Sequence, residues 1–344
     1  MKTIRIAAVA ACWLALPVVT RAADDTVKKV GEPPVKCSIT SISKDELKYE
    51  KNGKEEIVPS YAVESIRLAD EPFQLNLIRN QANNGAYENA LRALDKIDPD
   101  SLEKPEVKAE VQYLRAYCNA RLALGGSGDV KAAGKEVTAF IKANPNSFHF
   151  YPANELAGDL VVALGDYEAA TKFYKILSSA SADAWKIKAG IDAGRAKLAE
   201  KKYDEALTEF ETALGLAENS KGPETQQLSA MLGKAACLAQ TGKPDEGVKL
   251  AETIISKLPA EEVDLHARAY VVLGNCYRQM PNHTKQALLA FLHVDVLYFS
   301  NPQCHAEALW NLASLWQDLK KIDRATQASA LLKERYPNST WAKL

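Results

Sequence analysis

GDYEAA, at residues 165–170, is a segment of which close copies recur along the chain. Residues 85–90 read GAYENA, and residues 202–206 read KYDEA, the same segment without its glycine. Weaker copies bring the total to seven, and each copy is anchored on a small residue 36 to 43 positions from the next. The anchors are Ala90, Ala133, Ala170, Ala206, Gly247, Ala287 and Ala325. A period of this length indicates a solenoid built from one repeated supersecondary unit.

Each copy predicts a turn between two antiparallel helices, because the small anchor lets the paired helix approach closely. A second small residue recurs twelve positions before the anchor, as at Gly158 and Gly194. A proline twelve positions after the anchor, as at Pro145 and Pro337, ends the second helix because proline cannot continue it. The sequence therefore predicts a mainly α chain with about seven helical hairpins over residues 73–344.

This pattern resembles the tetratricopeptide repeat (TPR) family, and LGNCY at residues 273–277 is similar to the family's first-helix signature. NPNS at residues 144–147 and YPNS at residues 336–339 are similar to repeat endings in exported bacterial envelope members. The Tol–Pal coordinator and the outer-membrane assembly lipoproteins are members of that type. The resemblance implies an α-α superhelix that acts as a non-catalytic scaffold and binds a protein or peptide partner in its concave groove.

Side chains on the first helices of the hairpins are predicted to face that groove. The candidate partner-binding residues are Tyr113, Tyr117, Arg121, Lys188, Arg195, Arg268, Asn275 and Trp310, with Glu155 and Asp159 beside them. Aromatic residues and arginines carry much of the binding energy in protein interfaces. The alternative for each residue is a solvated helix face. Asn275 with Arg268 is only a fragment of the Lys/Asn set with which some family members hold a peptide carboxylate.

A different pattern over residues 35–70 predicts a small antiparallel β module. Alternation with period two occurs twice within residues 37–51 and again at residues 63–68. The Asn-Gly pair at residues 52–53 is a strong hairpin signal, because both residue types tolerate positive φ. Four short strands predict a bent sheet or an SH3-like barrel. Residues 24–34 are polar and contain prolines, and we expect a flexible leader there.

The first 23 residues have the pattern of a secretory signal peptide, with two basic residues before an apolar run at residues 6–19. That run is too short to span a bilayer comfortably, and small residues favour cleavage after Ala22 or Ala23. An uncleaved membrane anchor and lipoprotein processing at Cys12 are the alternatives. We therefore expect a periplasmic or secreted protein with no membrane span once the signal is removed.

Removal of the signal peptide would remove Cys12 and leave five cysteines. An exposed free thiol is a liability in an oxidising compartment, so we expect the five to be buried. Cys118, Cys237 and Cys276 occupy equivalent, tightly packed places on first helices, so we expect them to be small buried residues. The pattern does not place Cys37 or Cys304.

Composition and motifs give no support to catalysis or nucleic-acid binding. The 344 residues include 43 basic and 44 acidic ones, so there is no basic excess for nucleic acid, and 47% apolar residues is ordinary for a globular fold. No histidine has metal-ligand spacing, and GGSG at residues 125–128 lacks the Lys-Ser/Thr of a phosphate-binding loop. We expect no enzyme, catalytic residue, metal or cofactor. The alternative function is a ligand-binding or enzymatic role of the β module, with the repeats as its support.

Overall fold

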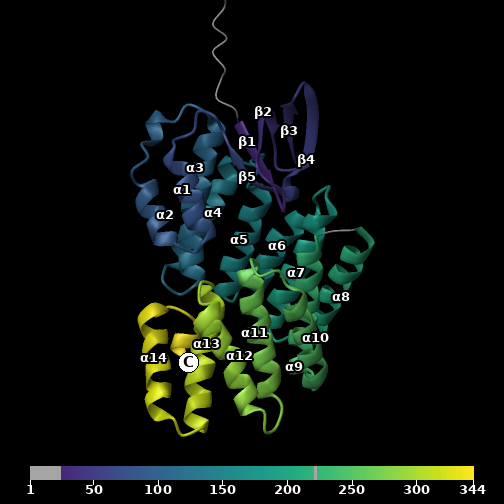
Figure 1. The fold of residues 1–344 in the computed structure, drawn as a ribbon, viewed down its shortest axis with the longest axis vertical. Helices are drawn as coiled ribbons and strands as arrows, with labels where there is room; N and C mark the ends of the chain where they lie inside the picture. Colours follow the sequence, from purple (N-terminus) through teal and green to yellow (C-terminus); the bar gives the residue numbers. More distant parts are fainter. Residues whose placement is uncertain (1–24, 221–222) are drawn as a thin grey trace, which may run out of the picture.

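The computed structural model describes residues 25–220 and 223–344, in which a five-stranded antiparallel sheet precedes fourteen helices (Figure 1). The fold class predicted from the repeats is confirmed, because the helices form a solenoid and the small sheet lies at its N-terminal end. The predicted signal peptide lies outside the described residues.

The sheet has the strand order β4-β3-β2-β1-β5, so β4 and β5 form its two edges. Its strands are β1 (Asp25–Lys29), β2 (Val35–Ile42), β3 (Glu46–Lys51), β4 (Lys54–Pro59) and β5 (Val63–Arg67). The predicted Asn-Gly turn joins β3 to β4, with φ of 53° at Asn52 and 73° at Gly53. Leu47 and Tyr49 on β3 are fully buried and form the centre of the small core.

The expectation of a flexible leader and of four strands is wrong, because β1 lies inside residues 24–34. Thr26 pairs with Lys36 on β2 and with Arg67 on β5, so the backbone of β1 is hydrogen-bonded on both sides. Val27 is only 1% exposed and packs in the core of the sheet. One buried valine and two neighbouring strands therefore order a segment whose composition is otherwise polar.

The helices form seven consecutive antiparallel pairs, as the repeat predicts. They are α1 (Gln74–Asn83) and α2 (Tyr87–Leu94), α3 (Pro105–Leu124) and α4 (Val130–Ala143), α5 (Phe150–Ala163) and α6 (Tyr167–Ser178), α7 (Asp183–Ala199) and α8 (Tyr203–Ser220), α9 (Glu224–Gln240) and α10 (Pro244–Lys257), α11 (Val263–Arg278) and α12 (Thr284–Leu297), and α13 (Pro302–Asp318) and α14 (Ile322–Arg335). Each helix packs on the next, and first helices of neighbouring pairs also touch.

The small residues of the repeat lie where the helices touch. All seven anchors are buried. A Cβ atom added at Gly158 would lie 2.3 Å from the Tyr174 ring, and one at Gly194 would lie 2.8 Å from the Phe210 ring. The recurring small residues thus make room for a large side chain of the paired helix, which explains their periodicity.

The solenoid closes on itself, which the repeat pattern did not predict. In Figure 1 the last pair, α13 and α14, lies directly beneath α1 to α4. The backbone N–H of Asn338 donates to the carbonyl of Gly126 at 2.9 Å, and Ser127 Oγ donates to the carbonyl of Arg335 at 2.9 Å. Gly126 has a φ of +85°, and a Cβ there would lie 2.6 Å from the Ser339 nitrogen. The 125–128 turn is therefore the contact that joins the second and seventh pairs into a ring.

A buried ion cluster joins the segment after β5 to the first helices. The Arg79 guanidinium on α1 donates to Glu71 at 2.7 and 2.8 Å and to Glu110 on α3 at 2.6 Å. His149 Nε2 lies 2.5 Å from the other oxygen of Glu110. Burial by itself raises the pKa of Glu110, but the neighbouring His149 and Arg79 outweigh it and lower that pKa to about 2.

Stability is expected to fall in acid because of Glu110. Its pKa of about 2 in the folded chain is below its ordinary value of 4.5, so this carboxylate stabilises the fold above pH 4.5. As pH falls from about 4.5 toward 2, protonation removes up to about 3 kcal/mol. Urea unfolding from pH 7 to pH 2 should show this loss, and the Glu110→Gln variant should show a shallower dependence. Parallel pH curves for the two proteins would contradict the assignment.

Candidate functional site

The ring encloses a cavity of about 1030 Å³ between the first helices of the middle and last pairs. Its polar lining includes Asp159 on α5, Arg195 on α7, Arg268 and Asn275 on α11, and Glu307 on α13. Trp341, in the short 3₁₀ turn that follows α14, contributes an apolar wall. Four helices and the 3₁₀ turn therefore contribute these side chains to one site.

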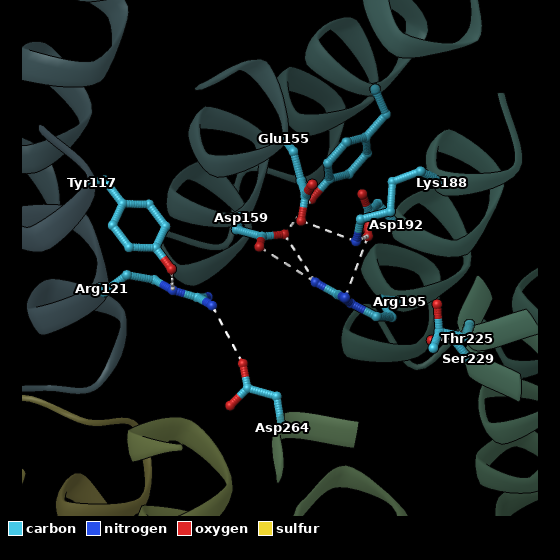
Figure 2. Close-up of polar contacts among 11 residues, drawn as sticks. Tyr117, Arg121, Glu155, Asp159, Lys188, Asp192, Arg195, Thr225, Ser229 and Asp264 are labelled. Carbon is cyan, nitrogen blue, oxygen red and sulfur yellow. Dashed lines mark hydrogen bonds and ion pairs between the residues drawn. The ribbon is translucent and has the colours of Figure 1, made fainter. Parts of the chain in front are cut away.

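An ion-pair network between α5 and α7 forms one side of this site (Figure 2). Arg195 contacts Asp159 at 3.1 Å and Asp192 at 3.3 Å. Lys188 contacts Asp192 at 3.1 Å and Glu155 at 2.9 Å. Two cations thus face three carboxylates, and every member has a partner of opposite sign.

The two aspartates of the network differ in their environment. Burial raises the pKa of Asp192 to about 6 despite the nearby Lys188 and Arg195 charges. The Oδ2 atom of Asp192 is buried with no hydrogen-bond partner in the part of the chain that the structure describes. Burial acts in the same direction on Asp159, but Arg195 and Lys188 outweigh it and lower its pKa. Asp159 is therefore the firmly ionised partner of Arg195.

Arg268 differs from the other cations of the site. Its guanidinium makes no ion pair and no hydrogen bond with any residue in the described ranges, although it lines the cavity. The Arg195 charge and burial together lower the pKa of Arg268. Glu307 lines the same cavity, but it accepts its hydrogen bond from Asn275 Nδ2 at 2.8 Å, and burial raises its pKa. The cavity thus holds one partly buried cation that makes no direct ion pair with a described residue, although the charges of Asp264 and Asp159 act on it favourably.

Residues 307–339, which comprise most of α13 and all of α14, match the model of the tetratricopeptide repeat family. This segment is similar to a tetratricopeptide repeat. Its seven helix pairs make it a TPR-like solenoid, and the comparison with curated proteins finds no match.

Solved structures share this fold at low sequence identity. A Rap protein complexed with competence and sporulation factor is 15% identical, with a TM-score of 0.50 over 78% of this chain and 76% of that one. NprR in complex with its cognate peptide NprX is 13% identical, with a TM-score of 0.48 over 78% and 81%. A tetratricopeptide repeat protein from Parabacteroides merdae is 16% identical, with a TM-score of 0.47 over 76% and 96%. At these identities the likeness concerns the fold alone.

Three of the eight predicted groove residues line the cavity of the TPR-like solenoid, namely Arg195, Arg268 and Asn275. Lys188 belongs to the adjoining ion-pair network. Arg121 lies at the rim, where it donates to the Tyr117 hydroxyl at 3.2 Å and contacts Asp264 on α11 at 3.6 Å (Figure 2). That ion pair also spans the ring closure, because α3 and α11 belong to the second and sixth pairs.

The three aromatic candidates differ in burial, because Tyr113 is buried whereas Tyr117 and Trp310 are half-buried. Tyr113 is in the core rather than on the groove, because its ring stacks on His149 with centroids 3.8 Å apart. Tyr117 packs against Tyr113, and Trp310 packs against Trp341 with centroids 5.2 Å apart. The position of a residue along the repeat predicts which face of a helix it lies on. It does not predict which side chains from other elements cover that face. Partner binding by the eight residues stays a prediction.

Several site residues were not identified from the sequence. Asp192 lies four residues after Lys188 and three before Arg195, and that spacing on one helix was an available signal for an ion network. Glu307 reaches the site because α13 stacks beside α11, and it lies 18 residues before its anchor Ala325, as Lys188 lies 18 before Ala206, so its register was an available signal. Trp341 lies beyond the last helix and packs against Trp310, and no repeat pattern indicates this.

A second cavity, of about 320 Å³, lies between the β module and α3, and it bears on the alternative function. Its apolar wall includes Ile42, Ile66 and Leu68, and its charged lining includes Arg79 and Glu110 with their partners and Glu106. Arg79 and Glu110 pair within the cluster described above, so among the described residues Glu106 is the charged lining group that makes no ion pair.

Cys118, Cys237, Cys276 and Cys304 are buried, which confirms the predicted burial of the first three. Within residues 25–220 and 223–344, no group of three or more His, Cys, Asp or Glu side chains is arranged to hold a metal ion. No described helix combines the length and the apolar character that a membrane crossing requires.

Proposed function

We propose that this protein is an exported, non-catalytic TPR-like scaffold of the bacterial cell envelope that holds a protein or peptide partner in its central cavity. The observation that carries the proposal is the cavity of about 1030 Å³, whose lining combines charges of both signs with apolar and aromatic side chains. Interfaces that recognise extended peptides use such mixed surfaces. A Rap protein of the same fold has been solved with competence and sporulation factor, which supports a ligand of this kind.

The interior of the ring is also suited to binding rather than to chemistry. Arg195 and Lys188 are fixed by carboxylates, so their positions are set before a partner arrives. Preorganised side chains lower the entropy cost of association. The proposed export rests on the signal-like first 23 residues, and buried thiols suit an oxidising compartment.

The test is site-specific photo-crosslinking in cells that produce the full-length chain. A photoreactive residue at Gln303, which lines the cavity, is expected to give discrete adducts with a partner protein or peptide. The matched control is the same residue at Lys172, whose side chain is 76% exposed on α6 and does not line the cavity. The adducts should be recovered from the periplasmic fraction, on a chain that begins at Ala23 or Asp24.

Three results would overturn the proposal. Equal crosslinking at both positions would move the binding surface away from the cavity. An intact Met1 on the mature protein would contradict signal removal. Turnover of a substrate by the purified protein would contradict the non-catalytic scaffold.

A further inference from the structure

We propose that the exposed face of α12, formed by Leu289, Leu292 and Val296, binds a second copy of this chain, with the two α12 helices packed antiparallel. This inference goes beyond the proposed function, because these residues do not line the central cavity. The partner is the same chain, so the interface must be self-complementary.

Leu289 occupies an outward position that is polar in every other helix pair. The residue two positions after the anchor is exposed in all seven pairs. In the other six pairs this residue is Arg92, Lys135, Lys172, Thr208, Lys249 or Gln327. The packing of the repeat therefore does not require a leucine at this position, because six pairs fold with a polar residue there.

The same change of residue type extends along α12 for two further turns. Leu292, five positions after the anchor, is half-buried, whereas the other pairs have an exposed residue there, such as Lys175. Val296, nine positions after the anchor, is exposed at the place where α4 has Lys142. Spacings of three and four residues put the three apolar side chains on one face of the helix.

This face lies within a group of exposed apolar side chains. Leu289, Val296, Leu297 and Phe299 are each more than half exposed, and they are four of the twelve large apolar side chains that are exposed in the described ranges. Exposed apolar residues that occur singly are ordinary, whereas a contiguous patch marks an interaction site. The exposed face of α12 is therefore expected to be covered by a partner.

The charge of the face indicates what covers it. Lys285 is the only charged residue among the exposed residues of segment 284–300, and Asp295 is partly buried and pairs with His305 at 2.9 Å. Such a face selects a partner face that is also nearly uncharged, because burying an unpaired charge is costly. The second helices of the other pairs carry polar residues at the leucine position, so among them α12 matches itself.

An antiparallel pair of α12 helices accommodates both the apolar side chains and Lys285. With the two-fold axis between residues 292 and 293, Leu289 lies opposite Val296 of the second copy. Lys285 then lies opposite Phe299 and the C-terminal end of the other helix. A cation is favourable over an aromatic ring and at the negative end of a helix dipole. A parallel pair would instead place two Lys285 ammonium groups opposite each other, where they repel.

The area of the face determines the strength of the expected dimer. Helix α12 has 14 residues, so at a rise of about 1.5 Å per residue it is about 21 Å long. One face of a helix about 10 Å wide is smaller than the roughly 800 Å² that a standard interface buries on each partner. We therefore expect a weak dimer, with a dissociation constant in the micromolar range.

The first experiment is sedimentation velocity of the mature chain from about 1 to 300 µM, a range that brackets a micromolar dissociation constant. The variant combines Leu289→Lys with Val296→Lys, which introduces residue types found at these positions in other pairs. Across an antiparallel contact this variant places two like charges opposite each other at both ends. The matched control is Leu77→Lys on α1, because Leu77 is 56% exposed and Leu289 is 57% exposed.

Wild type is expected to change from monomer to dimer over this range, and Leu77→Lys should do the same. The double variant should have a dissociation constant raised at least tenfold. Its melting temperature at low concentration should be unchanged, because both side chains are exposed in the monomer. A wild-type chain that stays monomeric, a dimer that persists in the double variant, or an equal loss in Leu77→Lys would overturn the inference.

The second experiment tests the antiparallel orientation by disulfide formation. The described native cysteines are buried, so cysteines introduced on the surface react first. A mixture of Leu289→Cys and Val296→Cys chains should give a crosslinked dimer under mild oxidation. Leu289→Cys alone should not crosslink, because the two copies of residue 289 lie about 10 Å apart along the helix axis, beyond the reach of a disulfide. Self-crosslinking of Leu289→Cys would show parallel helices and contradict the proposed interface.

A different partner on this face would be detected in cells. A photoreactive residue at Leu289 is expected to give adducts of twice the mass of the chain. Adducts only with another protein would assign the face to that protein and overturn the second copy as its occupant. Neither outcome changes the adducts expected at Gln303, so failure of this inference can be distinguished from failure of the proposed function.

Discussion

Replacing Phe210 with alanine is expected to lower the free energy of unfolding by about 3–5 kcal/mol, because the vacated space cannot close. Phe210 on α8 is 1% exposed and packs against glycines of two other helices. An added Cβ would approach its ring to 2.8 Å at Gly194 on α7 and to 2.2 Å at Gly233 on α9. The ring therefore fills the junction of three helices. Urea unfolding followed by circular dichroism measures the loss.

The matched control is Phe299→Ala, since Phe299 is 51% exposed. Its effect is expected to stay within about 0.5 kcal/mol, as for most exposed positions. Similar losses for the two variants would show that Phe210 does not fill a closed junction and that the register of α7, α8 and α9 is wrong.

Replacing Arg79 with alanine is the second change with a large expected effect, about 3–5 kcal/mol of unfolding free energy at neutral pH. Arg79 is the shared partner of Glu71 and Glu110, so the variant leaves Glu71 without a cation and leaves Glu110 with His149 alone. Their side chains are only 2% and 16% exposed, so water cannot take the place of the guanidinium. Chemical unfolding at pH 7 measures the loss.

Arg115→Ala is the control for Arg79, because Arg115 makes a comparably short contact of 2.6 Å with Asp95 at the surface. Exposed ion pairs contribute about 0–1 kcal/mol. If the two variants lost equal stability, the buried cluster would contribute no more than an exposed ion pair. Adding Glu110→Gln to Arg79→Ala should recover part of the loss, since it removes one of the stranded charges.

The helix pairs could be predicted from the sequence because the cause of the repeat is local. A small anchor such as Ala206 lies where the two helices of a pair touch. The number of anchors in the sequence therefore gives the number of helix pairs. The hairpin at Asn52 and Gly53 was predictable for the same reason, as positive φ restricts residue choice at a single position.

The ring closure could not be predicted because its cause is not local. The contact of Gly126 with Ser339 depends on the small rotation that each pair adds to the last, and residue spacing does not encode that rotation. The same limit applies to the site. Arg195 and Arg268 were identified from helical phase, whereas Trp341 lies beyond the last helix, where the repeat gives no register. β1 was missed because one apolar residue, Val27, is too little signal for a strand.

The hydrogen bonds of Asn338 with Gly126 and of Ser127 with Arg335 change how the array can come apart. An open stack of repeats behaves as a one-dimensional Ising chain whose end units have one neighbour each and therefore fray first. The contact between the second and the seventh helix pair gives the last pair a second neighbour, so the array behaves as a closed ring rather than as an open stack. Fraying at that end must then break two interfaces at once, so local opening there approaches the cost of global unfolding. Cooperativity in this molecule is thus a property of its topology as well as of its packing.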